Sequence, residues 1–229
     1  MRHGGDGLAA ESVTRRQTER EPTTASANVR TLLKRATQGL HDDVERHLDL
    51  NRPRWTAESY RRLLERFLGI YFPLEQLLDR VNWMDSGIVF SARRKVHWLE
   101  ADLVHFGLQP AALGDLDLCR NLPRLDDMVS GLGALYVLEG STLGGQVILR
   151  NLRPQLGLSP ETGGRFFSSY GADVGAMWRG FLAVLEQHGG EAAAEQAIVR
   201  GAVETFSAFA RWFDASGSSS HADTRYADV

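Results

Sequence analysis

The chain of 229 residues lacks the features that mark several large classes of protein. Its single cysteine, Cys119, excludes an intramolecular disulfide and a multi-cysteine metal site. No run of about 18 apolar residues is present to cross a membrane, and the N-terminus lacks the apolar segment of a secretory signal. The net charge is −3 and no Lys/Arg-rich run occurs. We therefore expect a cytoplasmic protein that binds neither nucleic acid nor membrane.

Helical periodicity fills the middle of the chain, and no run of alternating β-branched residues is present. The expected helices cover about 29–48, 57–78, 91–106, 125–152, 159–188 with a break near Gly171, and 191–214. Thr56, Ser91 and Ser159 are the candidate N-caps. Pro73 should kink or interrupt the second helix, and Pro154 should end the fourth. The last helix should bury one face, formed by Ile198, Ala202, Phe206, Phe209 and Phe213.

Both ends of the chain differ from this helical part. Residues 1–28 and 215–229 contain almost no large apolar side chains. Such segments cannot bury enough surface to offset the entropy lost on ordering, so we expect two disordered tails. The prediction is a single compact all-α domain over residues 29–214.

Glycine is concentrated in one apolar helix, residues 131–150 (GLGALYVLEGSTLGGQVILR). Each glycine inside a helix costs about 1 kcal/mol relative to alanine. Glycine is used where a ligand or another backbone must approach the main chain closely. Gly140 and Gly144 are four residues apart, as are Ser141 and Gly145, which predicts one bare helical face beside a small hydroxyl.

Several known motifs are absent from this stretch. Gln146 follows Gly145 where a phosphate-binding loop needs lysine, and Tyr136 stands where a dinucleotide fingerprint needs glycine. Glu139 replaces the first glycine of a nucleophile elbow around Ser141. A di-iron bundle requires Glu-x-x-His pairs, and the sequence contains none.

One constellation on the first helix remains. His41 lies on or beside the apolar face, with Glu45 one turn later and Lys34 two turns earlier, about 10 Å along the same face. His41 is either a hydrogen-bonded structural histidine or a ligand of metal or haem iron, since a neutral imidazole is the usual proximal haem ligand. Lys34 and His41 have the separation that suits a ligand held by its metal and by carboxylates at its edge.

These residues resemble a known family. LKRATQGLHDDVE, followed about a hundred residues later by YVLEGSTLGGQVI, is similar to the haem oxygenases, and most to the bacterial, biliverdin-producing branch associated with bacteriophytochromes. LLERFLGIYFPLE between them resembles the second helix of that branch. The resemblance covers about residues 29–214. It implies an all-α fold with haem between the first helix and the glycine-containing distal helix.

The resemblance also implies roles on the haem-binding side. His41 matches the proximal iron ligand, and Glu45 matches the acid that follows it by four. Lys34 and Arg179 match residues that pair with the haem propionates, a role that suits charge-assisted hydrogen bonds. Phe206 matches an aromatic that lines the pocket, although an ordinary core position explains it equally well.

On the distal side, Gly140, Gly144 and Gly145 match the glycines that contact the porphyrin. Ser141 stands where vertebrate-type members have an aspartate that organises the waters needed for proton delivery, so the proton-delivery network must differ. The vertebrate-type tyrosine just before this helix has no aligned partner, because Tyr136 is one position off.

The implied activity is the opening of haem by O2 and reducing equivalents to biliverdin, CO and free iron. Electrons would come from a ferredoxin- or flavodoxin-type protein or an NADPH-dependent reductase, and a bacteriophytochrome would receive the biliverdin. Two alternatives stay open. The first is a non-catalytic haem-binding or haem-sensing protein of the same fold. The second is a helical interaction module whose glycines only allow close helix packing.

Overall fold

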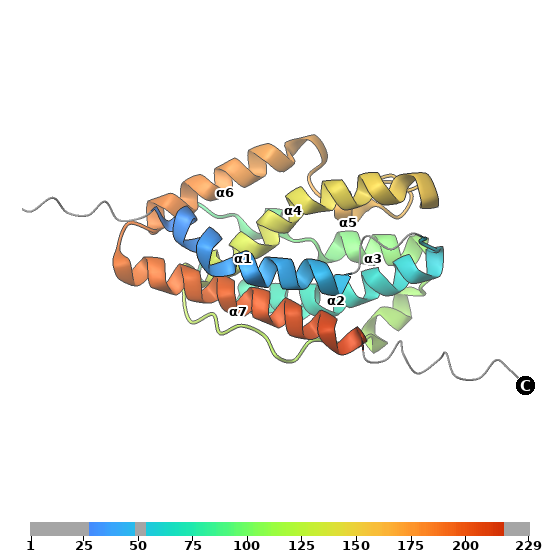
Figure 1. The fold of residues 1–229 in the computed structure, drawn as a ribbon, viewed down its shortest axis with the longest axis horizontal. Coiled ribbons are helices and arrows are strands. Elements are labelled where there is room, and N and C mark those ends of the chain that lie inside the picture. The colour runs from blue at the N-terminus through green and yellow to red at the C-terminus, as the bar shows by residue number, and fades with distance from the viewer. Residues whose placement is uncertain (1–27, 49–53, 218–229) are drawn as a thin grey trace, which may run out of the picture.

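The computed structural model describes residues 28–48 and 54–217, and these residues form helices and no strands (Figure 1). The expected tails 1–28 and 215–229 lie almost entirely outside this part of the chain. The α-helices are α1 (Val29–Leu48), α2 (Ala57–Asp79), α3 (Val96–His105), α4 (Met128–Leu156), α5 (Arg165–Ser168), α6 (Val174–His188) and α7 (Ala192–Gly217). Three short 3-10 helices, η1 (Phe90–Arg93), η2 (Pro110–Asp115) and η3 (Gly171–Asp173), complete the secondary structure. The predicted all-α class is confirmed.

Helix α7 is the central support of the fold, because both α1 and α4 pack along it (Figure 1). Its predicted inner face is confirmed: Ile198, Ala202, Phe206, Phe209 and Phe213 are all buried. Helix α6 packs on α4, and α2 on α3, which completes the core. Helices α1 and α4, which both rest on α7, carry most of the candidate site residues, and α6 and α7 carry the other two, Arg179 and Phe206.

Close packing of α4 on α7 explains one of the glycines. A Cβ at Gly133 would lie 2.1 Å from the backbone oxygen of Ile198, and one at Gly201 would lie 2.2 Å from that of Ser130. Backbone atoms cannot rotate away, so both positions require glycine. Helix packing therefore accounts for Gly133, as the interaction-module alternative expects, but for only part of the glycine-rich stretch.

The predicted interruption at Pro73 is wrong, because α2 continues through it. Proline has no N–H to donate to the carbonyl four residues earlier, which here belongs to Gly69. The amide of Cys119 donates to that carbonyl instead, at 2.8 Å. The connection between α3 and α4 thus satisfies the group that proline leaves unpaired.

Pro154 does not end α4 either. The helix reaches Leu156, and Gly157 ends it in the left-handed conformation with φ +66°. The amide of Gly157 donates to the carbonyl of Arg153. This is the usual glycine end of a helix, and it overrides the nearby proline.

Two of the three predicted N-caps are also wrong. Thr56 caps α2 as expected, in a capping box with Ser59. Ser91 lies inside η1, and the N-terminus of α3 is held by Glu75 of α2, which accepts the amides of Lys95 at 2.5 Å and Val96 at 3.2 Å. Ser159 precedes a turn rather than a helix. Helices α3 and α5 are both capped by carboxylates from other helices, as described for α5 below.

Helix α4 is, by length and composition, apolar enough to cross a membrane, contrary to the expectation from the sequence. However, 56% of its most apolar window is buried inside the structure. An apolar helix with that burial is the core helix of the fold described here.

Candidate functional site

A pocket of about 410 Å³ lies where α1, α4 and α6 meet. Helix α1 supplies its polar wall, and Tyr136 of α4 with Trp178 and Leu182 of α6 supply its apolar wall. The rings of Tyr136 and Trp178 lie 5.6 Å apart, so the apolar wall is continuous between the two helices. The pocket combines an aromatic surface with a charged rim, which suits an apolar ligand that carries acidic groups.

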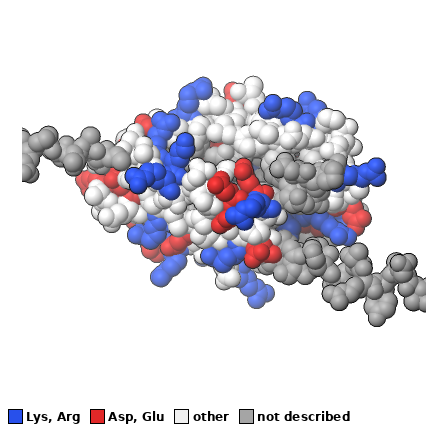
Figure 2. Space-filling model, in the orientation of Figure 1, with Lys and Arg blue, Asp and Glu red and all other residues white. Residues whose placement is uncertain are grey.

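The rim is basic and contains Lys34, one of the predicted residues. Arg30 and Arg35 lie beside it, and Arg30 also pairs with Glu186 of α6 at 3.1 Å. In Figure 2, Lys and Arg side chains surround the start of α1, and acidic side chains gather over its C-terminal half. The start of α1 is therefore the end of the site that would attract carboxylates.

His41 lies two turns further along α1, and its side chain is 52% exposed. Its Nδ1 atom is 3.8 Å from a carboxylate oxygen of Glu45 and 4.0 Å from one of Asp42, distances longer than a hydrogen bond. Among the described residues these three side chains form a group of metal-ligating atoms within 4.8 Å of one another. Within the described part of the chain no hydrogen bond holds this half-exposed ring, which does not fit a hydrogen-bonded structural histidine and leaves the ring nitrogens available to a ligand.

Phe206 and Arg179, the other predicted haem-side residues, are placed differently from each other. Phe206 of α7 is buried and meets the His41 ring edge-on, with 5.9 Å between ring centroids. Arg179 follows Trp178 on α6 and is exposed, but its guanidinium lies over Gly175 of its own helix. The structure brings Phe206 to His41, whereas Arg179 is not among the residues that line the pocket.

The distal glycines of α4 have different neighbours. Gly145 is buried, and a Cβ there would lie 3.1 Å from the backbone oxygen of Phe167, so this glycine lets α5 approach α4. Gly140 is half-buried, with the indole of Trp178 3.7 Å from the position of a Cβ. Gly144 is exposed and has nothing within 4 Å of that position. The bare face therefore consists of Gly140 and Gly144, and Gly145 points to the core.

Exposed apolar side chains flank this bare face. Leu143 and Val147 are 41% and 49% exposed. At about 100° per residue, both lie with Gly140 and Gly144 within one side of α4 that spans about 100°. Close helix packing does not explain Gly144, because no described atom lies within 4 Å of its Cβ position. An apolar surface that contains such an uncovered glycine fits a flat apolar ligand.

Ser141 forms a hydrogen bond with Tyr71, a residue that the sequence alone did not point to. Its hydroxyl donates to the carbonyl of Leu138 at 2.8 Å and lies 2.9 Å from the hydroxyl of Tyr71. A serine has one hydroxyl proton, so Tyr71 is the donor in the second bond. Burial raises the pKa of Tyr71, although the bond to Ser141 opposes the shift. Tyr71 therefore keeps its proton and directs it at Ser141.

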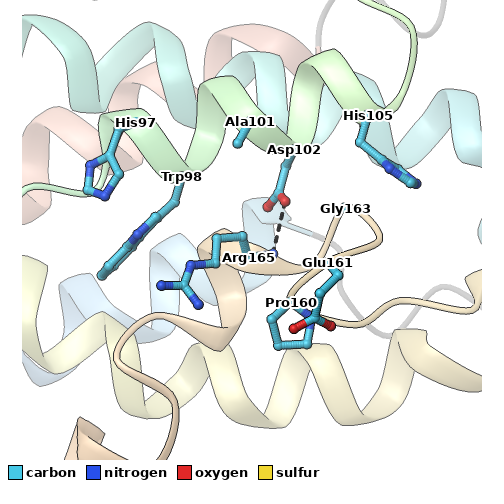
Figure 3. A pocket seen from close by; sticks show the side chains of 9 residues that line it. All are labelled: His97, Trp98, Ala101, Asp102, His105, Pro160, Glu161, Gly163 and Arg165. Atoms are coloured by element: carbon cyan, nitrogen blue, oxygen red, sulfur yellow. Dashed lines mark hydrogen bonds between the residues drawn. The ribbon is translucent and has the colours of Figure 1, made fainter.

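A second cavity, of about 400 Å³, lies between α3 and residues 160–165 (Figure 3). At its floor Asp102 accepts the amides of Arg165 at 2.9 Å and Phe166 at 2.8 Å, and so caps α5. Burial raises the pKa of Asp102 to about 6, against the effect of these amides. None of the predicted site residues lines this cavity. The Asp102 carboxylate at its floor already accepts two backbone amides.

Sequence reasoning missed the aromatic wall and Tyr71. Tyr136 lies one turn before Gly140 on the same helix, so helical spacing alone could have identified it. Arg30 lies one turn before Lys34 on α1, so the same spacing could have identified it. Trp178 and Tyr71 come from other helices, and no local spacing connects them to the site.

Comparisons with known proteins agree with this geometry. A family model described as heme oxygenase matches residues 27–215. A heme oxygenase from Xanthomonas campestris pv. campestris (strain 8004) is 35% identical over 158 residues, which cover 67% of this chain and 87% of that protein.

Solved structures show the same fold. The NO- and CO-bound heme oxygenase of Neisseria meningitidis superposes with a TM-score of 0.71 at 20% identity, over 84% of this chain and 94% of that one. The heme oxygenase of Leptospira interrogans gives a TM-score of 0.63 at 18% identity, over 82% and 100%. These relatives are bacterial, as the sequence motifs predict. From the family model and the Xanthomonas relative it follows that this chain belongs to the haem oxygenase family and is an enzyme of that class.

Proposed function

We propose that the chain opens the haem ring oxidatively, with O2 and external electrons, to give biliverdin, CO and free iron. The observation that carries the proposal is the uncovered Gly144, which lies on α4 beside the exposed side chains of Leu143 and Val147 and has no described atom within 4 Å of its Cβ position. Half-exposed His41 is on α1, and both helices rest on α7. Haem would lie between them as the substrate.

His41 would bind the iron through a ring nitrogen. Glu45, 3.8 Å from Nδ1, would orient the ring through that atom, and Phe206 would support it from the side of α7. When bound, haem supplies the oxidative chemistry, because its iron binds O2 and the ring is opened at a meso carbon. The protein supplies orientation and electrostatics.

The basic rim would hold the propionates. Lys34 lines the pocket with Arg30 and Arg35, and Arg179 would join them by turning from its own helix. Salt bridges to two carboxylates fix the rotation of a planar ring within its pocket. These anchors would therefore decide which meso carbon faces α4, and the resemblance implies the α position.

The distal face would act through its backbone. Gly140 and Gly144 let the main chain of α4 approach the ring, so that the space left on that side of the iron is narrow and directed towards one edge. Ser141 and Tyr71 would hold water and a proton there, in place of the carboxylate of vertebrate-type members. Tyr71 suits this role because its proton already points at Ser141.

Partners and location follow from the same proposal. The glycine-rich stretch has no phosphate- or dinucleotide-binding signature, so a separate ferredoxin- or flavodoxin-type protein or an NADPH-dependent reductase would deliver electrons. A bacteriophytochrome would be the recipient of biliverdin, and the cytoplasm the place of reaction.

The direct test is to titrate the purified protein with hemin and to follow the visible spectrum during reduction by ascorbate under air. Conversion of the Soret band to the spectrum of biliverdin supports the proposal. A tight hemin complex that persists would instead favour the non-catalytic haem binder, for which the serine at position 141 is the supporting observation. Absence of hemin binding would refute both.

The ligand is tested by His41→Ala. We expect it to weaken hemin binding and to change the spectrum of the ferric complex, because an iron–nitrogen bond is lost. His47→Ala is the matched control, since His47 lies on the same helix and bonds to the carbonyl of Asp43. An unchanged spectrum in His41→Ala would exclude His41 as the ligand.

A further inference from the structure

A buried cluster of charges lies on a different side of α4 from the bare face formed by Gly140 and Gly144. Glu139, the residue before Gly140, is 1% exposed. One of its carboxylate oxygens accepts Lys95 Nζ at 2.7 Å and the hydroxyl of Tyr170 at 2.9 Å, and the other accepts Arg93 at 2.5 Å. Two separate segments of the chain, residues 93–95 and the loop that carries Tyr170, therefore hold one side chain of α4.

This arrangement is costly. Lys95 is 1% exposed, and the effective penalty for burying a charge is several kcal/mol per ion, which a partner only partly offsets. Burial lowers the pKa of Lys95, and Glu139 is the main group that opposes the shift. Apolar side chains of the same volume would hold α4 to its neighbours at least as strongly. The cluster is therefore not explained by stability alone.

The charges add a fixed rotation and axial position of α4, which apolar packing does not impose. Apolar contacts tolerate a sliding or rotating helix, whereas a carboxylate with three donors is satisfied in only one position. Two residues later, Ser141 is held by Tyr71 at 2.9 Å. Gly144 is five residues after Glu139 and hence on roughly the opposite side of the helix. The polar contacts thus hold α4 on a side that lies about 100° around the helix from Gly140 and about 140° from Gly144.

The segment that carries Tyr170 is itself strained. Ser169 has φ +51°, a conformation that non-glycine residues rarely adopt, and its buried hydroxyl has no hydrogen-bond partner among the described residues. Strain of this kind costs about 1–3 kcal/mol and persists only where the surroundings impose it. Here it accompanies the turn that brings the Tyr170 hydroxyl to Glu139.

We propose that Glu139 and Lys95 are positioning residues for ring opening: they fix the rotation and axial position of α4, and thereby which edge of the ring the backbone of Gly140 and Gly144 faces. This inference rests on the proposed function. It adds to that function a determinant of the product isomer which lies outside the pocket and touches no ligand.

The decisive variant is Glu139→Met combined with Lys95→Met, which removes both charges at similar volume. We expect the full-length double variant to fold and to bind hemin within a few-fold of the wild type. We expect amide hydrogen exchange in residues 139–146 of the hemin-free protein to accelerate about tenfold, without a comparable rise in α7. We also expect the biliverdin isomers, separated chromatographically, to become a mixture.

Tyr170→Phe provides a milder variant in case the double variant does not fold. It removes one hydrogen bond to Glu139 and keeps the ring that packs edge-on against Trp98. A smaller change in the same two measurements is expected. Glu75→Gln is the matched control, because Glu75 is also a buried acid but bonds to the start of α3 rather than to α4. It should accelerate exchange in α3 and leave the isomers unchanged.

The outcomes separate the inference from the function on which it rests. Unchanged exchange in residues 139–146, or an unchanged isomer pattern in a folded double variant, overturns the positioning role. Acceleration spread equally over all helices also overturns it, since that is the behaviour of a general stability defect. If the wild type does not convert hemin, the proposed function fails, while the exchange measurement still decides whether the charges hold α4.

Discussion

Gly144→Ala tests whether the glycine faces a ligand or is a defect in a helix. Alanine is about 1 kcal/mol better than glycine inside a helix. A Cβ at position 144 would meet nothing within 4 Å, so no clash offsets that gain. The hemin-free variant should therefore be more stable by about 1 kcal/mol, which raises the melting temperature by about 2–4 °C for a chain of this length. Thermal unfolding followed by circular dichroism measures it.

Hemin binding should change in the opposite direction. A methyl group on the bare face would occupy space that a macrocycle needs, and overfilling a packed contact costs about 1–3 kcal/mol. The dissociation constant should therefore rise by about 5- to 150-fold, since 1.4 kcal/mol corresponds to a factor of ten. Spectroscopic titration of the same preparation gives this value.

Gly39→Ala is the control, because Gly39 is an exposed glycine inside α1 with nothing within 4 Å of its Cβ position. It lies two residues before His41 and thus on nearly the opposite side of that helix. It should give the gain in stability without the loss of affinity. If Gly144→Ala is stabilised and binds hemin within twofold of the wild type, the reasoning that places a ligand at Gly144 is refuted.

Other variants test the surrounding structure. Gly133→Ala should lower the unfolding free energy by at least about 3 kcal/mol, because its Cβ would lie 2.1 Å from the backbone oxygen of Ile198; denaturant titration measures this. Ser169→Gly should raise the unfolding free energy by about 1 kcal/mol, because it relieves a positive φ and removes an unpaired hydroxyl; an unchanged melting temperature would contradict it. Burial raises the pKa of Glu75 from 4.5 to about 7, so the folded state retains a proton that the unfolded chain has lost. Its contribution to the unfolding free energy should therefore fall as pH rises from 4.5 to about 7, and Glu75→Gln should lose that slope in denaturant titrations across this range.

Local sequence patterns predicted most of the helices, because the residues that form each amphipathic face belong to one continuous segment. Helix α1 has the predicted limits, Thr56 caps α2, and the buried face of α7 is confirmed. The two wrong caps share a cause. The caps at Ser91 and Ser159 were inferred from neighbours in sequence, whereas carboxylates on other helices cap α3 and α5.

In the candidate site, too, relations within one helix were predictable and relations between helices were not. Lys34 lines the pocket, and His41 and Glu45 lie one turn apart on α1, because helical spacing within one element determines both relations. Gly145 shows where spacing fails. It is next to Gly144 in sequence, but α5 covers it, and only the tertiary structure decides which glycine of the pair is bare.

Glu139 stands out in the sequence as a lone charge in an apolar helix, but the sequence does not show which residues pair with it. Residues 128–149 contain one charged side chain, and it is this glutamate. A lone acid in an otherwise uncharged core helix is too costly to bury without a cation, so its position alone implies a buried partner. Nothing local identifies that partner, because Lys95 and Arg93 are more than forty residues away. Lysine is also rare here: the chain has two, Lys34 at the pocket rim and Lys95 beneath the distal helix, and all its other side-chain cations at neutral pH are arginines. Arginine is the more usual cation of a buried ion pair, because guanidinium is more weakly hydrated than ammonium, and Glu139 holds one of each kind, Arg93 and Lys95.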